Sequence, residues 1–229
     1  MQDSIELLES IEGDIQNKEK KEIIAEKIAM KVENGQVIGA GSGSSSWLAV
    51  KAIAKRVKEE GLEIEILPTS YEIELLCRTL GLKVTSLLSK KPDWSFDGAD
   101  EVDPNGNLLK GRGGAMLREK MNMVQAPITY ILVDDSKFVE KLGTKFAVPV
   151  ECERLAVGYV KKELEKLGAS KVGLRKAVAK DGPVITENNN VILDATFPEI
   201  PNTLEKNIKK ITGVIESGLF IGYDVEIVK

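Results

Sequence analysis

The first ninety residues alternate between stretches with helical periodicity and stretches typical of strands. Residues 18–34 carry apolar side chains at helical spacing, and Gly35 follows as a stop signal. The expected helices cover 18–34, 47–61 and 71–80, and the expected strands cover 36–41, 63–68 and 82–88. This alternation predicts an α/β fold with a Rossmann-like parallel sheet that carries helices on both faces.

After residue 142 the pattern changes to strand, helix, strand, strand, helix, strand, which predicts a smaller ferredoxin-like α+β domain. The expected strands cover 146–153, 171–180, 188–197 and 213–220, and the expected helices cover 154–168 and 202–212. Asn202 or Thr203 is the expected N-cap of the second helix. We therefore place a catalytic domain at 1–142, to which 223–229 return, and a small domain at 143–222.

Composition and charge exclude several classes of protein. The 229 residues have a formal net charge of −4 and no basic run, which argues against a nucleic-acid partner. No apolar stretch is long enough to span a bilayer, and the N-terminal MQDSIELLES lacks the features of a signal peptide, so we expect a cytoplasmic protein. There is no histidine, which leaves proton transfer to carboxylates, lysines, tyrosines or cysteines. Cys77 and Cys152, each among apolar neighbours, are expected to be core thiols.

The serine-rich segment GSGSSS at 41–46 follows an expected strand and opens an expected helix. Backbone N–H groups at such a helix start favour an anion, and a phosphate fits well. A flexible helix cap explains the same letters equally well. A nucleotide site is disfavoured, because no Gly-Lys-Ser/Thr follows and the dinucleotide glycine pattern is broken at Ser46.

A second polar segment, DGADEVDPNGNLLKGRGGAMLREK at 97–120, also follows an expected strand. Its first seven positions hold four carboxylates that are suited to a divalent cation or to sharing a proton, namely Asp97, Asp100, Glu101 and Asp103. The letters Asp-Pro-Asn-Gly are typical of a turn, to which we assign Asp103. Since ligands of parallel sheets lie at the carboxyl ends of the strands, this segment and 41–46 are expected at one edge of the sheet.

Glu119 lies in the helix that opens from the glycine cluster of this segment. Leu117, Met121 and Val124 form an apolar stripe at helical spacing, and Glu119 is expected on the opposite side. An exposed glutamate is the ordinary interpretation of such a position. The nearby Lys110 and aspartates favour a carboxylate base with a cation that stabilises an oxyanion.

The blocks SGSS (42–45), DGADEVD (97–103), KGRGGAMLREK (110–120), DDSK (134–137), PVEC (149–152) and GVIESGLF (213–220) resemble the type A ribose-5-phosphate isomerases. They occur in the order found in that family and extend over most of the chain. One departure is Arg112, which stands where the family usually has glycine.

The resemblance implies catalytic roles for Glu119 as proton acceptor, assisted by Asp97, Asp100 and Lys110. It implies contacts to the substrate from one longer set: Ser42, Gly43, Ser44, Ser45, Asp97, Gly98, Ala99, Asp100, Lys110, Gly111, Arg112, Gly113 and Lys137. Lys21 resembles a phosphate-contacting lysine of the family. The resemblance also implies that no metal and no cofactor is needed.

The expected activity is the aldose–ketose isomerisation of D-ribose 5-phosphate and D-ribulose 5-phosphate through an enediolate. A regulatory module that binds the same sugar phosphate without turnover is the alternative. A nucleotide-binding oxidoreductase is disfavoured by the broken glycine pattern, and an isomerase-deaminase rests only on fold analogy. A small ferredoxin-like domain often packs against a copy, so a homodimer or homotetramer is expected.

Overall fold

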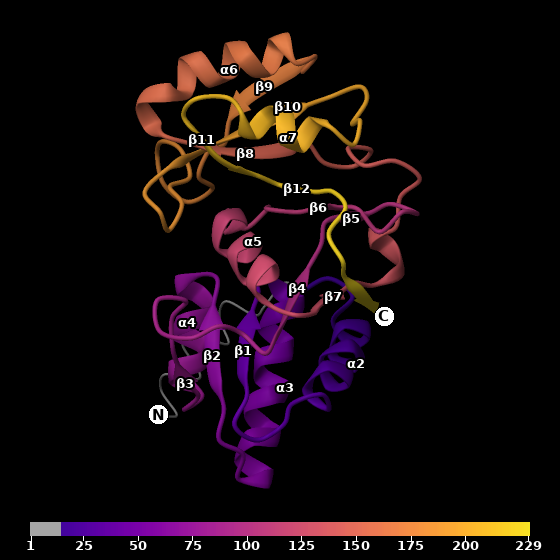
Figure 1. The fold of residues 1–229 in the computed structure, drawn as a ribbon, viewed down its shortest axis with the longest axis vertical. Coiled ribbons are helices and arrows are strands. Elements are labelled where there is room, and N and C mark those ends of the chain that lie inside the picture. Colours follow the sequence, from indigo (N-terminus) through magenta and orange to yellow (C-terminus); the bar gives the residue numbers. More distant parts are fainter. Residues whose placement is uncertain (1–14) are drawn as a thin grey trace. The chain divides into compact units, whose positions relative to one another are not determined.

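The computed structural model describes residues 15–229, and the N-terminal MQDSIELLES, from which a cytoplasmic location was predicted, lies outside them. These residues divide into two compact units (Figure 1). Unit 1 comprises the described residues up to Gly98, together with 118–136 and 224–229. Unit 2 comprises 99–117 and 137–223. No helix within residues 15–229 is both long and apolar enough to cross a bilayer.

Unit 1 is built on a six-stranded parallel sheet with the order β13-β7-β4-β1-β2-β3. The strands are β1 (Val37–Ala40), β2 (Glu65–Pro68), β3 (Lys83–Val84), β4 (Trp94–Gly98), β7 (Thr129–Leu132) and β13 (Glu226–Val228). The chain runs from β1 to β2 on one side and later to β4 on the other. The direction of winding therefore reverses between β1 and β4, which is where such sheets bind ligands.

Helices cover both faces of this sheet, as the alternating sequence pattern predicted. One face packs on α2 (Lys18–Ala29), α3 (Ser44–Glu60) and α4 (Tyr71–Thr79), which share a core with Ile38, Ile66 and Phe96 (Figure 1). The other face carries α5 (Met116–Gln125), whose Asn122 lies against Gly39 and donates a hydrogen bond to the carbonyl of Leu67 at 2.9 Å.

The predicted strand at 82–88 is wrong in its length. Only Lys83 and Val84 pair with β2, and the chain then turns, with Ser89 N–H bonded to the carbonyl of Ser86. Leu88 is 99% exposed. Because β3 is the edge of the sheet, no neighbour on its outer side holds the following residues extended.

Unit 2 contains a four-stranded antiparallel sheet with the order β11-β8-β10-β9. Its elements in chain order are β8 (Val148–Cys152), η2 (Arg154–Ala156), α6 (Val157–Lys166), β9 (Lys171–Leu174), β10 (Val191–Thr196), α7 (Leu204–Lys209) and β11 (Val214–Ser217). Each strand-helix-strand unit has another strand inserted between its two strands, which is the ferredoxin-like arrangement that the sequence predicted. Thr203 precedes α7 but makes no side-chain capping hydrogen bond, contrary to expectation.

The predicted strand at 213–220 divides at Gly218 into β11 and β12 (Leu219–Phe220), which belong to different sheets. Strand β12 joins a small antiparallel sheet with β5 (Glu101–Val102) and β6 (Leu108–Leu109). A side chain at position 218 would place its Cβ 2.1 Å from the carbonyl oxygen of Lys110, so glycine is required at this crossing.

Residues 99–117 lie in unit 2, whereas the sequence assigned them to the first domain. The pairing of β6 with β12 accounts for the difference, because Leu109 is opposite Leu219 in the register. These partners are more than one hundred residues apart along the chain. No local pattern around Leu108 and Leu109 indicates which strand they will join.

Candidate active site

The serine-rich segment follows β1 and enters α3. Gly43 occupies the N-cap with a φ of 83°, and α3 already begins at Ser44, three residues earlier than predicted. Ser44, Ser45 and Ser46 therefore form the first turn of a 17-residue helix. The N–H groups of this first turn have no partners within the helix. This helix start is suited to an anion because its N–H groups and its dipole both favour negative charge.

A buried lysine reaches this helix start. Lys21 of α2 is 7% exposed, and its Nζ donates a hydrogen bond to Ser44 Oγ at 2.9 Å. Holding an ammonium group in such a place costs free energy unless negative charge or hydrogen bonds compensate it. The structure thus brings a cation to the predicted phosphate loop, on the residue that the resemblance indicated.

Two neighbouring strand ends complete the sheet edge around the serines. Ser42 Oγ lies 2.7 Å from Thr69 Oγ1, which follows β2. Gly41 contacts Asp97 of β4 so closely that a Cβ at position 41 would lie 2.1 Å from Asp97 Cγ. Thr69 was not among the predicted substrate-binding residues. Its position directly after β2 is the signal that indicates a place at this edge of the sheet.

Asp97 and Gly98 end β4 within the same unit. Asp97 is buried, and its Oδ1 accepts a hydrogen bond from Gly98 N–H at 2.7 Å. A Cβ built on Gly98 would lie 3.8 Å from Ser45 Cβ. The predicted aspartate and the predicted serine loop therefore meet at the point where the winding of the sheet reverses.

Glu119 lies on α5 and is only 5% exposed. The predicted apolar stripe is wrong, since Met121 and Val124 are 42% and 57% exposed, whereas Glu119 and Lys120 are buried. This helix therefore exposes two apolar side chains and buries two ionisable ones, although Met116 and Met123 are buried as well. A buried carboxylate in such a helix is a functional candidate on physical grounds alone.

The remaining predicted residues belong to unit 2. Lys110 is 3% exposed, its N–H donates to the carbonyl of Gly218 at 2.9 Å, and its Nζ lies 5.1 Å from the centroid of the Phe220 ring. Gly111 is buried with a φ of 103°, and a Cβ there would lie 2.4 Å from Met116 Cγ. The turn after Lys110 thus depends on glycine for both its backbone conformation and its packing.

Arg112 and Gly113 are exposed, Ala99 is buried, and Asp100 is partly buried. Asp100 Oδ2 accepts a hydrogen bond from Arg112 N–H at 3.3 Å, so the acidic start of the segment 97–120 contacts its glycine cluster. Lys137 ends the short 3₁₀ helix η1 (Asp135–Lys137) and is half-buried.

The predicted group of four carboxylates does not stay together as one ligand set. Glu101 is fully buried, and its oxygens accept hydrogen bonds from the N–H groups of Gly143 (2.6 Å), Lys145 (2.5 Å) and Phe146 (2.9 Å). Asp103 forms the predicted turn by accepting from the N–H groups of Asn105 and Asn107. Among residues 15–229, no group of three or more His, Cys, Asp or Glu side chains is arranged to hold a metal ion.

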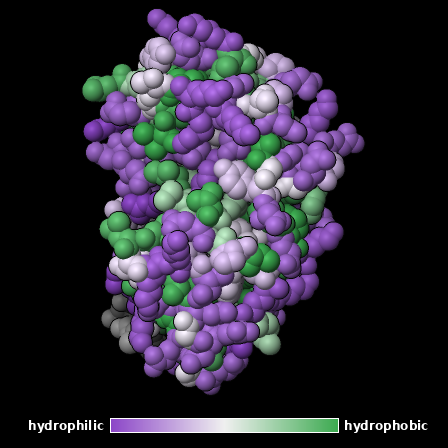
Figure 2. Space-filling view, in the orientation of Figure 1, coloured by the Kyte–Doolittle hydropathy of each residue, from purple (hydrophilic) through white to green (hydrophobic). Residues whose placement is uncertain are grey.

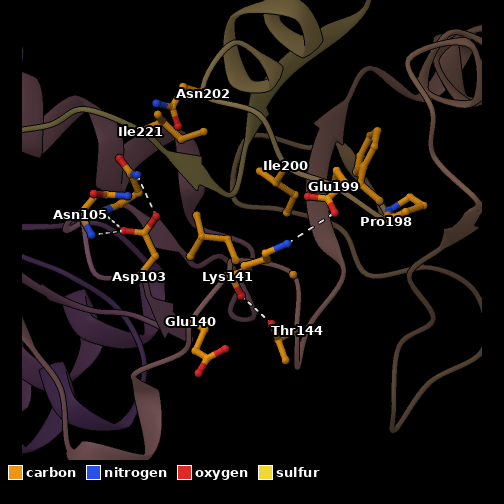
Figure 3. Close-up of a pocket in the computed structure, with 14 residues that line it drawn as sticks. Asp103, Asn105, Glu140, Lys141, Thr144, Pro198, Glu199, Ile200, Asn202 and Ile221 are labelled. Carbon is orange, nitrogen blue, oxygen red and sulfur yellow. Dashed lines mark hydrogen bonds and ion pairs between the residues drawn. The ribbon is translucent and has the colours of Figure 1, made fainter.

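A pocket of about 360 Å³ lies elsewhere in unit 2, between the Asp103 turn and the segments around Lys141 and Ile200 (Figure 3). Figure 3 shows that the Asp103 carboxylate is directed at its own turn and that Lys141 points to Glu199, at 3.5 Å. No predicted substrate-binding residue lines this pocket. Lys141 pairs with Glu199 and Asp103 with the amides of its own turn, so these groups are engaged within the fold.

Comparison with known protein families decides which family this is. Residues 65–228 match the family model described as ribose 5-phosphate isomerase A (phosphoriboisomerase A). The chain belongs to the ribose 5-phosphate isomerase A family. The resemblance inferred from the sequence motifs is therefore confirmed.

Curated relatives in the ribose 5-phosphate isomerase A family match almost end to end. The chain is 43% identical over 204 residues to ribose-5-phosphate isomerase A of Methanothermobacter thermautotrophicus, which covers 88% of this chain and 89% of the relative. It is 42% identical over 206 residues to the protein of the same name from Thermococcus kodakarensis, covering 88% and 90%.

Solved structures of ribose 5-phosphate isomerases share the fold. The ribose 5-phosphate isomerase A of Methanocaldococcus jannaschii superposes with a TM-score of 0.89 at 35% identity, over 93% of this chain and 96% of that one. A D-ribose-5-phosphate isomerase in complex with phospho-erythronic acid gives a TM-score of 0.87 at 38% identity, over the same shares.

Proposed function

We propose that this chain interconverts D-ribose 5-phosphate and D-ribulose 5-phosphate as an aldose–ketose isomerase. The observation that carries the proposal is the match to ribose 5-phosphate isomerase A over nearly the whole chain. A sugar-phosphate-binding module without turnover receives no support from the comparisons.

The proposed phosphate site is formed by Ser42, Gly43, Ser44 and Ser45. The free N–H groups at the start of α3 and the dipole of this helix support that assignment. The buried ammonium group of Lys21, 2.9 Å from Ser44 Oγ, adds a positive charge for a dianionic ligand. Lys137 is assigned a further substrate contact.

In the proposed reaction, Glu119 removes the proton from C2 of the open-chain aldehyde. The electrons of the C–H bond form the C1–C2 double bond of an enediolate, and the negative charge develops on O1. The carboxyl group then returns the proton to C1, while the proton of O2 passes to O1 and the C2–O2 bond becomes the ketone carbonyl. The burial of Glu119 supports this role, since a base that acts on carbon needs a desolvated site.

Lys110 is assigned to the stabilisation of the negative charge on the enediolate, and its burial strengthens any charge interaction that it makes. Asp97 and Asp100 are assigned to ring opening and to proton movement between O1 and O2. The segments 98–99 and 111–113 are assigned to backbone contacts with the sugar, where Arg112 replaces the usual glycine.

We further propose that the chain has two domains, which correspond to the compact units and replace the expected boundary at residue 142, and that the protein is cytoplasmic and assembles as a homodimer or homotetramer. Exposed apolar side chains on unit 2 support self-association, since Leu155 is 96% and Tyr159 51% exposed. Light scattering after size-exclusion chromatography would measure the mass, and a monomer at micromolar concentration would contradict the last proposal.

The test is an assay of D-ribulose 5-phosphate formation from D-ribose 5-phosphate in D₂O. The expected result is turnover with deuterium at C1 of the product, because a carboxyl group that carries the proton exchanges with solvent. Binding of D-ribose 5-phosphate without turnover would contradict the isomerase and establish the sensing module. Deuterium at C1 would exclude a direct hydride shift from C2 to C1, because a hydride shift carries the original hydrogen without exchange.

A further inference from the structure

Arg175, which follows β9, binds two successive carbonyl groups of the segment Lys110–Gly114, which we call the glycine turn. Its Nη1 donates to the carbonyl of Gly111 at 2.8 Å and to that of Arg112 at 2.9 Å. Its Nε donates to Asp194 Oδ2 at 3.0 Å, and Nη2 donates to the other carboxylate oxygen. One half-buried guanidinium thus joins the proposed substrate-binding turn to the sheet of unit 2.

The face of the sheet that carries Asp194 is the one turned away from α6 and α7. Along β10, Leu193 and Ala195 belong to the core under these helices, so Ile192 and Asp194 alternate onto the other face. Ile192 Cδ1 lies 3.0 Å from the position of a Cβ on Gly114, and Pro149 Cγ lies 3.4 Å from that on Gly111. The glycine turn therefore lies on the outer face of the sheet.

The two hydrogen bonds from Arg175 fix the direction of two peptide groups. In a trans peptide the N–H points opposite to the C=O, so holding the carbonyls of Gly111 and Arg112 directs the N–H groups of Arg112 and Gly113 away from the guanidinium. The first of these meets Asp100 Oδ2 at 3.3 Å. Gly113 is exposed, and a Cβ there would meet nothing within 4 Å, so this position is open to solvent.

We propose that Arg175 is a positioning residue for the isomerisation. It sets the peptide orientation of the glycine turn that carries Lys110, and Asp194 orients its guanidinium in turn. This inference rests on the proposed function and assigns a task to the outer face of the ferredoxin-like sheet. A lysine cannot replace the arginine, because a single ammonium group lacks the planar fork that binds a carboxylate and two carbonyls together.

The variants Arg175→Met, Arg175→Lys and Asp194→Asn test the proposal, with Ile208→Val as a matched control. Ile208 lies in the core on the helix side of the same sheet, so its truncation lowers the stability of unit 2 without touching the glycine turn. We expect kcat to fall on the order of 10- to 100-fold in both Arg175 variants, with KM changing less, since misplaced catalytic groups have effects of this size. The kcat of Asp194→Asn is expected to lie between that of the wild type and those of the Arg175 variants. Ile208→Val is expected to keep the wild-type kcat.

A second measurement does not depend on turnover. Arg112 is exposed and is a trypsin site, so the rate of cleavage after it, followed by mass spectrometry, reports the order of the glycine turn. Faster cleavage in Arg175→Met and Asp194→Asn than in Ile208→Val would support the proposal even if the wild-type chain failed to isomerise ribose 5-phosphate, a result that would contradict only the proposed function.

Three results would overturn the positioning role. One is wild-type kcat and wild-type cleavage in Arg175→Met. Another is an equal loss of kcat in Ile208→Val, which would reduce the effect to general destabilisation. The third is full activity of Arg175→Lys, which would show that positive charge alone is sufficient. If Arg175→Met does not fold, Asp194→Asn, which keeps the arginine, decides by the same two measurements.

Discussion

On α5, the surroundings of each residue, and not its residue type, determine whether its side chain is buried. Glu119 is 5% exposed although charged residues stand on both sides of it in the sequence, while the apolar Val124 of the same helix is 57% exposed. Burying an ionisable group costs free energy unless hydrogen bonds or an opposite charge compensate it. The arrangement is understandable if the buried carboxylate is retained for chemistry.

The substitution Glu119→Gln removes the proposed base while keeping the shape of the side chain. We expect kcat to fall on the order of 10²- to 10⁴-fold, the usual contribution of a positioned base, with little change in the thermal midpoint. Steady-state kinetics with ribose 5-phosphate and a melting curve measure both. Glu59→Gln, the same change at an exposed position near the end of α3, is the control. Near-wild-type turnover in Glu119→Gln would end the assignment.

Gly41→Ala tests the contact between the serine loop and Asp97. The added methyl group would lie 2.1 Å from the Asp97 carboxyl group, so the aspartate must move. We expect a loss of about 1–3 kcal/mol in the free energy of unfolding, as in other overpacked sites, and a lower kcat/KM. Denaturant unfolding and the isomerase assay check the two effects.

Gly158→Ala is the matched control for that change. Gly158 lies in α6, and nothing stands within 4 Å of its Cβ position. Alanine there is expected to stabilise the protein by up to about 1 kcal/mol, because it favours the helix. If Gly41→Ala matched this control in stability and activity, the tight contact with Asp97 would be without consequence.

Among the secondary-structure elements, the helices α4 and α7 differ in whether a side chain caps their first backbone N–H groups. Ser70 caps α4 by accepting a hydrogen bond from Ile73 N–H at 3.2 Å. Thr203 stands at the equivalent position before α7 and accepts none. Thr203 was a predicted cap, and both residues are of types that are favoured in front of a helix. Their different outcomes provide a comparison within one chain.

Ser70→Ala is expected to lower the free energy of unfolding by about 1 kcal/mol, whereas Thr203→Ala is expected to change it by only a few tenths. Urea unfolding followed by circular dichroism measures both variants under the same conditions. A loss in Thr203→Ala as large as that in Ser70→Ala would contradict the difference between the two caps. Neither substitution is expected to change the KM for ribose 5-phosphate.

The whole molecule consists of two units that have separate hydrophobic cores, and each core contains one cysteine. Cys77 belongs to the core of unit 1 and Cys152 to that of unit 2, and both are fully buried. Burial raises the pKa of the Cys77 thiol from 9.0 to about 12 and that of Cys152 to about 11. Surface side chains, by contrast, are mostly hydrophilic on the face that Figure 2 shows, with apolar ones scattered among them.

Both thiols are therefore expected to resist alkylation at pH 8 in the native protein and to react when their own unit unfolds. Mass spectrometry after labelling at increasing urea concentration assigns each reaction to one unit. The folded-state pKa values of both thiols are raised, so the buried neutral thiols contribute to the free energy of unfolding. This contribution is fully present below pH 9 and is lost as the pH rises through 11 and 12. Rapid labelling of either cysteine without urea would contradict its burial.

Extensive treatment with EDTA is expected to leave the isomerase activity unchanged. The physical reason is that Glu101 and Asp103, two of the four carboxylates suited to a cation, are engaged by backbone N–H groups. The coupled assay before and after dialysis measures the effect. A large loss that a divalent ion restores would revive a metal site at Asp97 or Asp100.

Much of the architecture was predictable because it depends on local periodicity. The helix and strand order of unit 1, its parallel sheet and the ferredoxin-like order of unit 2 follow from apolar spacing and from glycine at the ends of elements. The predicted strand at 82–88 was too long because its position at the edge of the sheet limits its length. The predicted apolar stripe on α5 was wrong because spacing alone does not show which side of a helix is covered. Arg175 was missed, since nothing around it in the sequence indicates a contact with residues 111 and 112.

The sequence by itself determined the family, the types of the secondary-structure elements and the residue types available for the chemistry, because these depend on short-range pattern and on motif identity. Only the tertiary structure decided that Lys21 meets Ser44, that Glu119 is buried and that the chain changes sheets at Gly218. Each of these depends on contacts between residues far apart in the chain. Such contacts are set by how whole faces of sheets and helices cover one another, and local preference does not contain that information.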